Sequence, residues 1–386
     1  MLLLFQLFVL PVLYFVHGQE QKVADNTLRQ NQLVRAVQES YVKMKMAIMM
    51  DVNNELTAVD MKPVNRSGVD NRRRITLDLS NDVGFYFYSR KNMEYPVLYR
   101  STNISDLANN ELFNTTKNTI VLVHGYLNNL TSPMIQLNLK ALLKYRDLNV
   151  IAVDWYQVMA KQDNVYAWCA EDTFPVGVAV GQAVSGLIRG GLKPSMAHFV
   201  GHSLGAHVVG VAGKFLKGLN QTIARITGLD PAKIEFEDIS VGLRINAADA
   251  EYVDCIHSCG GYLGFDRPIC QTDFYPNGGL MQPGCSFLGD ICCVCSHGRS
   301  YHYFAESIKP KHIFPAARCL WTSDGLLGCT DSPQMMGYPA KSEFKGAFYV
   351  KTMSDYPFSP AIERPPEYGW WSQLQAWLLS IRLIIS

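Results

Sequence analysis

Short apolar runs and amphipathic stretches alternate along the chain from Val83 onward. The apolar runs are rich in Val and Ile, which favours buried strands, and the stretches between them have helical spacing. Strands that alternate with helices are typical of a mostly parallel sheet covered by helices on both faces. The pattern predicts one α/β domain over residues 75–358, without internal repeats. The predicted strands cover residues 119–125, 149–155, 197–203, 223–230 and 251–257, and the predicted helices cover 134–145, 176–188 and 204–216.

Residues 19–74 lie outside this pattern because they are mostly polar. One stretch, "QLVRAVQESYVKMKMAIMM" (32–50), has the apolar spacing of a helix. The segment ends at three arginines, Arg72 to Arg74. In a secreted chain this triplet is compatible with a processing site, which would make the segment a propeptide, and equally with an exposed loop. The residues leave both interpretations open.

Residues 1–18, "MLLLFQLFVLPVLYFVHG", form an apolar stretch that is too short to cross a bilayer. Small residues stand at Val16 and Gly18, so the stretch predicts a cleaved signal peptide and a secreted, extracellular protein. Five N-x-S/T sequons agree with secretion and predict glycosylation at Asn65, Asn103, Asn114, Asn129 and Asn220.

The tail, residues 359–386, ends in the apolar stretch "WWSQLQAWLLSIRLIIS". As a helix it would carry three tryptophans, but it is short and is interrupted by Arg382. It is therefore not expected to span a membrane. Two interpretations stay open: an interfacial helix in peripheral contact with lipid, and a helix packed on the protein body.

The cysteines and the charge restrict the classes of partner. The net charge is +1 and the basic residues are scattered, which argues against nucleic acid. Ten cysteines in a secreted chain predict five disulfides. The stretch "CCVCSHGRSYHY" (292–303) has the spacing of half a zinc site, but no second pair of ligands stands at the matching distance. No metal is expected, and these cysteines are predicted to anchor a loop.

The strongest chemical signal is G-x-S-x-G, from Gly201 to Gly205, between an apolar strand and an apolar-faced helix. This context is that of a nucleophile elbow, a turn so sharp that side chains at the two glycine positions would collide. The elbow would present the hydroxyl of Ser203 at a helix N-terminus. The sequence therefore predicts that Ser203 is a nucleophile.

A serine nucleophile needs a base, and the base needs a carboxylate to orient it. Asp230 is the first acid after Ser203 at the carboxyl end of a predicted strand, whereas Asp249 and Asp254 fit this position less well. His297 is predicted in a loop tethered by Cys295, just before a helix, from where an imidazole can reach the elbow. The alternative base, His257, stands at the end of a strand and also suits a packed, hydrogen-bonded histidine.

Ester cleavage also needs N–H donors for the oxyanion that forms in the transition state. One candidate is the backbone N–H of Leu204, directly after the nucleophile. The other is the N–H of Tyr126 in "VLVHGYLNN", after an early strand. An ordinary strand-end turn is the alternative interpretation of this second segment.

Five motifs, in this order, are similar to those of the pancreatic lipase gene family, especially its secreted insect lipase and phospholipase A1 branches. They are "VLVHGY", "GHSLGAH", "TGLDPA", "DFYPNGG" and "CSHGRSYHYFAESI". The resemblance runs from about Val83 to Phe358 and implies an α/β-hydrolase fold. It implies Ser203, Asp230 and His297 as the catalytic triad, with the same two N–H groups as the oxyanion hole.

The resemblance also implies two disulfides, Cys285–Cys295 and Cys319–Cys329. The remaining cysteines, 169, 255, 259, 270, 292 and 293, allow 15 pairings that the sequence does not rank.

The family's calcium site is only partly matched. Arg244 and Asp249 agree with it, but Val241 and Asn246 stand where acidic residues would be expected. No cofactor is therefore expected. Too few residues follow Phe358 for the family's C-terminal β-sandwich, so no colipase-like partner is expected either.

Loop length bears on the substrate. Nine residues separate Cys285 from Cys295, and the segment between Cys259 and Asp273 is also short. Short versions of both loops mark the phospholipase A1 members of the family, which implies release of the sn-1 acyl chain of phospholipids. The alternatives are a triacylglycerol lipase, a general carboxylesterase, and a non-catalytic lipid-binding or yolk-type protein of the same fold.

Overall fold

The computed structural model describes residues 46–50, 56–60, 76–285 and 293–360. Its main feature is an 11-stranded sheet in the order β12-β11-β13-β10-β9-β8-β7-β5-β6-β3-β4. Neighbouring strands from β6 to β13 pair in parallel, and the pairs at both edges are antiparallel. The strands are β3 (Gly84–Tyr88), β4 (Val97–Tyr99), β5 (Thr119–Val123), β6 (Asn149–Asp154), β7 (Ala197–His202), β8 (Arg225–Leu229), β9 (Tyr252–Ile256), β10 (Thr272–Pro276), β11 (Ala316–Thr322), β12 (Gly325–Thr330) and β13 (Gly346–Val350).

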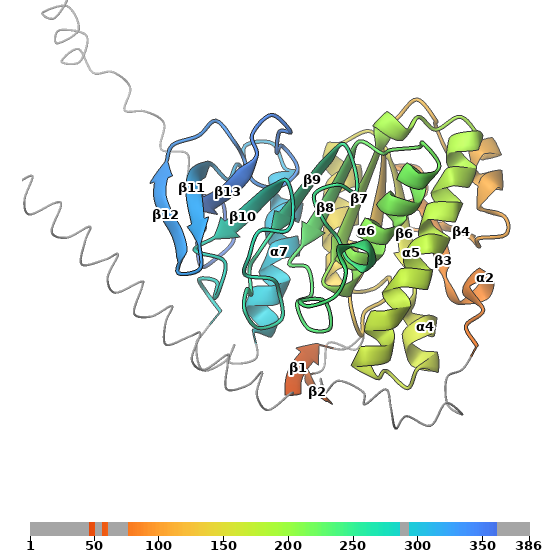
Figure 1. The fold of residues 1–386 in the computed structure, drawn as a ribbon. Coiled ribbons are helices and arrows are strands. Elements are labelled where there is room, and N and C mark those ends of the chain that lie inside the picture. The colour runs from red at the N-terminus through yellow and green to blue at the C-terminus, as the bar shows by residue number, and fades with distance from the viewer. Residues whose placement is uncertain (1–45, 51–55, 61–75, 286–292, 361–386) are drawn as a thin grey trace, which may run out of the picture.

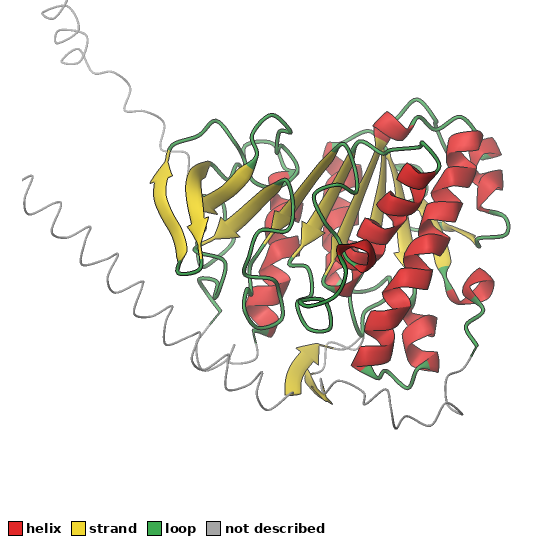
Figure 2. Ribbon diagram, in the orientation of Figure 1, coloured by secondary structure: helices red, strands yellow, loops and turns green. Residues whose placement is uncertain are grey.

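Helices cover both faces of the sheet, and each face has its own apolar core. The helices α5 and α6 pack on one face and stand in front of the sheet in Figure 1, whereas α3 and α7 pack on the other. Figure 2 shows the same layers by secondary structure. Because both faces are covered, every residue of β5, β7 and β9 is buried, which explains their continuous apolar character. The helices are α2 (Leu79–Asp82), α3 (Pro133–Tyr145), α4 (Tyr156–Lys161), α5 (Tyr166–Arg189), α6 (Leu204–Gly218) and α7 (Val294–Ser307), with 3-10 turns η1 (Ile104–Asn109), η2 (Pro194–Met196) and η3 (Val241–Leu243).

The predicted α/β architecture is confirmed. All five predicted strands are present, as β5 to β9, and the predicted helices correspond to α3, α5 and α6. Helix α5 begins ten residues earlier than predicted and continues through Pro175. The strands β3, β4 and β10 to β13 were not predicted. For β4 and β12 the reason is exposure of one or both faces, which interrupts the continuous apolar pattern used to find β5 to β9.

The helix predicted at residues 32–50 is wrong over Met46–Met50, the part of it that the structure describes. Met46–Met50, the end of the stretch 32–50, forms strand β1, which pairs antiparallel with β2 (Leu56–Asp60). The short connection allows the apolar run to satisfy its backbone groups across a hairpin instead of within a helix. The predicted signal peptide, residues 32–45, Asn65, the arginine triplet and the apolar tail stretch lie outside the described residues. Among the helices described, none is both long enough and apolar enough to cross a membrane.

Candidate active site

Ser203 occupies a sharp turn between β7 and α6, with a backbone φ of 55°. A Cβ on Gly201 would lie 2.2 Å from the carbonyl oxygen of Gly205, so the turn itself requires glycine there. Glycine is required at position 205 for a different reason, because a Cβ there would lie 2.4 Å from the carbonyl oxygen of Val123 on the neighbouring strand β5. The elbow geometry therefore presses α6 and the nucleophile against the end of β5.

Asp230 follows β8, the strand next to β7, and its side chain is fully buried. Its Oδ1 accepts hydrogen bonds from the N–H groups of Ser258 (2.7 Å) and Cys259 (3.1 Å). Its Oδ2 lies 2.5 Å from Nδ1 of His297. A Cβ on Gly264 would lie 2.4 Å from Oδ1, so the chain closes tightly around the carboxylate. These contacts fix the carboxylate and point one oxygen at the imidazole.

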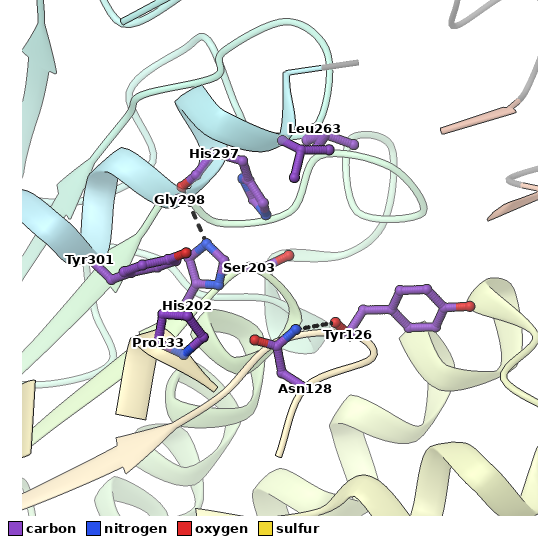
Figure 3. A pocket seen from close by; sticks show the side chains of 10 residues that line it. Tyr126, Asn128, Pro133, His202, Ser203, Leu263, His297, Gly298 and Tyr301 are labelled. Atoms are coloured by element: carbon purple, nitrogen blue, oxygen red, sulfur yellow. Dashed lines mark hydrogen bonds between the residues drawn. The ribbon is translucent and has the colours of Figure 1, made fainter. Parts of the chain in front are cut away.

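His297 lies in the first turn of α7, not in a loop before the helix as the sequence predicted. The helix begins at Val294 because Cys293 takes a left-handed conformation (φ 63°) and its carbonyl accepts the N–H of His297 at 2.7 Å. With Nδ1 bound to Asp230, the ring's Nε2 is the nitrogen left for proton transfer. Ser203 and His297 line the same pocket (Figure 3).

The two candidate oxyanion donors also meet the elbow. Gly125 approaches so closely that a Cβ there would lie 2.8 Å from the Cβ of Ser203. This contact brings the next residue, Tyr126, into the wall of the pocket, while its ring points away and its hydroxyl donates to the carbonyl of Asn164 (Figure 3). Among the described residues, the N–H groups of Tyr126 and Leu204 donate to no other backbone group. Both N–H groups therefore stay candidates for the oxyanion hole.

His202 was not predicted as a site residue, although it stands between Gly201 and Ser203 in the elbow motif. Its ring lies 4.4 Å from the His297 ring, centroid to centroid, and its Nε2 donates to the His297 carbonyl at 3.3 Å. Burial holds the pKa of His202 well below its usual value, so the ring is neutral. The ring contacts Tyr301 on its other side, and both residues line the pocket. The one signal in the sequence that could have suggested His202 as a site residue is its position directly before Ser203.

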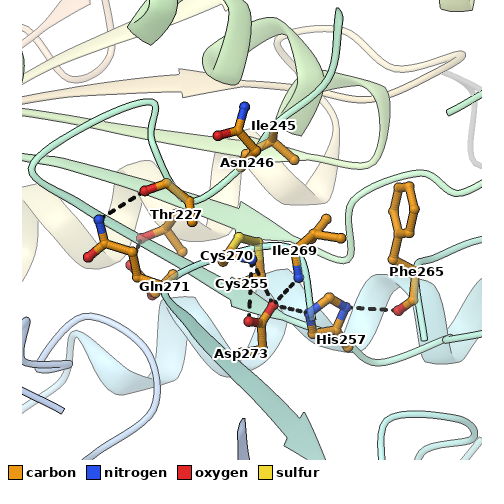
Figure 4. The surroundings of a disulfide bond; sticks show 12 residues. Thr227, Ile245, Asn246, Cys255, His257, Phe265, Ile269, Cys270, Gln271 and Asp273 are labelled. Carbon is orange, nitrogen blue, oxygen red and sulfur yellow. Dashed lines mark hydrogen bonds and ion pairs between the residues drawn. A yellow bond between two sulfur atoms is a disulfide. The ribbon is translucent and has the colours of Figure 1, made fainter. Parts of the chain in front are cut away.

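His257, the alternative base, lies apart from the pocket. Its Nε2 donates to Asp273 at 2.8 Å and its Nδ1 to the carbonyl of Phe265 at 2.8 Å (Figure 4). Burial alone would lower the pKa of His257, but the bond to Asp273 outweighs burial and the pKa is raised. Cys255 lies beside this pair, which gives a cluster of metal-ligand type, but its sulfur is bonded to Cys270. The cluster is thus a buried ion pair beside a disulfide.

The described residues form four disulfides. The structure joins Cys285 to Cys295 and Cys319 to Cys329, the two pairs that the resemblance implies. It adds Cys255–Cys270 and Cys259–Cys293. The sulfurs of Cys293 and Cys295, in the cluster at 292–303, are therefore both bonded to other cysteines and are not free to bind a metal. The expectation that every cysteine is paired is wrong for Cys169, which is a buried free thiol, and Cys292 lies outside the described residues.

The residues that correspond to the family's calcium site bind a positively charged side chain of the protein, Lys214. The Lys214 ammonium, from α6, donates to the carbonyl of Arg244 at 2.6 Å and to Asp249 Oδ2 at 2.7 Å. Burial raises the pKa of Asp249 to about 6, so the carboxylate is still ionised at neutral pH. Asn246 donates its own N–H to the same carboxylate, and its amide donates to the carbonyl of Val241. These residues do not fit a calcium ion, because an ammonium already takes the oxygen atoms.

The described sequons lie at the surface. Asn103, Asn114 and Asn220 are exposed and Asn129 is half-buried. At Asn114 and Asn129 the side-chain oxygen accepts the N–H and the hydroxyl of the threonine two residues on. Glycosylation at these positions stays a prediction.

Comparison with known proteins agrees with this geometry. The family model described as Lipase matches residues 48–358. The chain is 36% identical over 220 residues to phospholipase A1 member A of Rattus norvegicus, covering 55% of this chain and 47% of that protein. It is 32% identical over 272 residues to pancreatic triacylglycerol lipase of Myocastor coypus (62% and 58%). It is 32% identical over 301 residues to inactive pancreatic lipase-related protein 1 of Homo sapiens (69% and 62%).

The chain spans about half the length of the phospholipase A1 relatives that it matches. The family match nevertheless covers most of the chain, including every element that carries the site. The chain therefore belongs to the lipase family, the family of pancreatic lipases that its motifs resemble.

Proposed function

We propose that this protein is a secreted serine hydrolase that cleaves acyl esters of lipids. The observation that carries the proposal is the arrangement around one pocket: Ser203 on its elbow, His297 beside it, and Asp230 bonded to the far side of the imidazole. Three groups in this order are the requirement for nucleophilic ester cleavage. Four disulfides support secretion, since such bonds persist in oxidising compartments.

Each residue has a defined role in the proposed reaction. Oγ of Ser203 attacks the ester carbonyl while Nε2 of His297 takes its proton, and the carboxylate of Asp230 stabilises the imidazolium. The N–H groups of Tyr126 and Leu204 bind the oxyanion, each contributing about 3–4 kcal/mol in the transition state. The imidazolium then protonates the leaving alcohol. Water, activated by the same histidine, releases the fatty acid from Ser203.

We propose that the substrate is a phospholipid cleaved at the sn-1 position. The segment between β9 and β10 supports this choice, because it is short and packs into the body of the protein. Tyr262, Leu263 and Phe265 in this segment are buried, and Cys270 ties its end to β9. Residues 286–292, which make up most of the segment between Cys285 and Cys295, lie outside the described residues. A short segment at this place suits a lipid with a polar head group, and the similarity to phospholipase A1 member A agrees with this proposal.

The test is a positional assay with purified protein. Phosphatidylcholine with different acyl chains at sn-1 and sn-2 is offered beside triolein, and the products are identified by mass spectrometry. We expect the sn-1 fatty acid and a 2-acyl lysophospholipid, with little product from triolein, and neither product from Ser203→Ala.

Other outcomes would point to the alternatives. Ready hydrolysis of triolein with phosphatidylcholine untouched would indicate a triacylglycerol lipase. Lipid binding without hydrolysis would indicate a non-catalytic member, a possibility that matters because one relative is named inactive.

A further inference from the structure

We propose that the Cys259–Cys293 disulfide is a positioning element that holds the Asp230–His297 pair in register. The proposal rests on the proposed function, because it assigns the bond a role in that same triad. Both sulfurs belong to fully buried residues, and the bond joins segments 34 residues apart in the chain. What distinguishes this bond is that each of its ends contacts a different member of the triad.

On one side, Cys259 is part of the carboxylate's surroundings. Its N–H donates to Asp230 Oδ1 at 3.1 Å, beside the 2.7 Å bond from Ser258. Its carbonyl accepts the N–H of Gly264 at 3.0 Å, and Gly264 is the residue that closes against the same carboxylate oxygen. A shift of Cys259 would therefore move both walls of the carboxylate's binding site.

On the other side, Cys293 sets the start of α7. It stands directly before the helix in a left-handed conformation, and its carbonyl accepts the N–H of His297 at 2.7 Å. Because that is a first-turn hydrogen bond, the position of Cys293 fixes the depth and rotation of the turn that carries the imidazole. A shift of Cys293 would move His297 relative to Asp230.

Noncovalent contacts also tie the Asp230 loop to the first turn of α7. They include the Asp230–His297 contact itself, a 3.5 Å contact from Ser258 Oγ to the His297 carbonyl, and Gln282, which donates to the Ser258 carbonyl and to Ser296 Oγ. The imidazole takes up a proton in every catalytic cycle, so its partner must stay in place while the charge changes. A covalent bond between the two supports meets that requirement.

The other disulfides provide matched controls. Cys255–Cys270 has one buried and one partly buried cysteine, and it joins β9 to the segment before β10 without touching the triad. Cys319–Cys329 crosses the edge hairpin β11–β12. Both controls report what the loss of a crosslink does to stability alone.

The experiment compares three double variants, Cys259→Ala/Cys293→Ala, Cys255→Ala/Cys270→Ala and Cys319→Ala/Cys329→Ala, well below their melting temperatures. We expect the first to lose about 10- to 100-fold in kcat, as for a misplacement of up to an ångström, with KM within twofold. The controls should lose melting temperature but keep kcat. Full kcat in the first variant, or an equal loss in all three, would overturn the proposal.

A cycle with Asp230→Asn separates positioning from general loosening. In the Asp230→Asn background the carboxylate is absent, so removing Cys259–Cys293 should cost little further kcat. A full additional loss in that background would overturn the assignment to the Asp230–His297 pair.

A spectroscopic readout keeps the test valid if the protein hydrolyses none of the lipids offered. The proton between His297 Nδ1 and Asp230 should give a far-downfield ¹H resonance, assigned by its absence in His297→Ala. We expect this signal to broaden or vanish in Cys259→Ala/Cys293→Ala and to persist in both controls. A persistent signal in the first variant would overturn the positioning role, whereas absent hydrolysis with the expected signals would overturn the proposed function alone.

Discussion

Lys214 on α6 forms an ion pair with the buried carboxylate of Asp249, with 2.7 Å between Nζ and Oδ2. The same ammonium binds the carbonyl of Arg244, so a side chain of the protein supplies the positive charge at this place. This ion pair lies between α6, which begins directly after Ser203, and the segment that follows Asp230. The Lys214 ammonium therefore helps to hold together the two parts of the chain that carry Ser203 and Asp230.

The first prediction follows from that ion pair. We expect the melting temperature and activity of the wild type to be the same in EDTA and in millimolar calcium. Lys214→Met should lower the free energy of unfolding by about 2–3 kcal/mol, less than a fully buried pair because the lysine is partly exposed. Lys217→Met is the matched control, since the Lys217 ammonium is exposed and donates to the carbonyl of Ala248 instead of to the Asp249 carboxylate. A melting temperature that falls on chelation would contradict this prediction.

The second prediction concerns the nucleophile. Ser203→Ala should reduce kcat by about 10⁶-fold, because the elbow offers no second hydroxyl to the base. Asp230→Asn should reduce it by about 10⁴-fold, through loss of the imidazole's orientation. Circular dichroism spectra should match the wild type in both cases. Activity of Ser203→Ala at a tenth of the wild-type level would mean that another residue is the nucleophile.

The third prediction tests how tightly the chain closes around the Asp230 carboxylate. Gly264→Ala would place a methyl group 2.4 Å from Oδ1, so the carboxylate must move away from His297. We expect kcat to fall about 100-fold, as for a misplaced catalytic group. Gly218→Ala is the control, because nothing lies within 4 Å of a Cβ at that position. Equal kcat for the two variants would show that the carboxylate tolerates displacement.

The fourth prediction concerns acid stability and His207, which is buried in α6. Its Nε2 donates to the carbonyl of Ala232, and its Nδ1 accepts the N–H of Ile245, so the ring is held neutral. Burial lowers the pKa of His207 to about 3. Between pH 6.5 and about pH 3, His207 is protonated in the unfolded chain but stays neutral in the folded chain. Stability is therefore complete above pH 6.5 and falls on acidification, by up to about 1.4 kcal/mol per pH unit for this residue.

Denaturant titrations from pH 7 to pH 4 measure this effect. His207→Gln keeps a neutral donor near the carbonyl of Ala232 but has no proton to gain, so its stability should fall less steeply with acidification than that of the wild type. Parallel slopes for the two proteins would rule out His207 as a source of acid sensitivity.

Local patterns predicted the elbow, Asp230 and the central strands, because each depends on neighbours in sequence: glycine spacing, a strand end, an apolar run. His297 was predicted as a candidate base, and the structure places its Nδ1 beside Asp230. The helix after it was also predicted, but its start was placed too late because Gly298 and the cysteines resemble loop residues. The partners that complete the site are distant in sequence. Nothing near Lys214 indicates that it bonds to Arg244 and Asp249, since the contact exists only after α6 packs on the segment that follows β8.

The pairing of Cys259 with Cys293 was equally beyond the sequence. Six unassigned cysteines are compatible with many pairings, and only the close approach of the Asp230 loop to α7 selects this one. The sequence thus predicted the candidate triad, whereas the three-dimensional fold was needed to find the residues that hold it in place.

Three of the disulfides interlock along the chain, since Cys259–Cys293 overlaps both Cys255–Cys270 and Cys285–Cys295. A chain that oxidised its cysteines in order of synthesis would join Cys169 to Cys255 and Cys259 to Cys270. To reach the native set from there, it must break these bonds by thiol–disulfide exchange. Native pairing thus depends on exchange as well as on oxidation, so we expect heterologous expression to require an oxidant together with a disulfide isomerase.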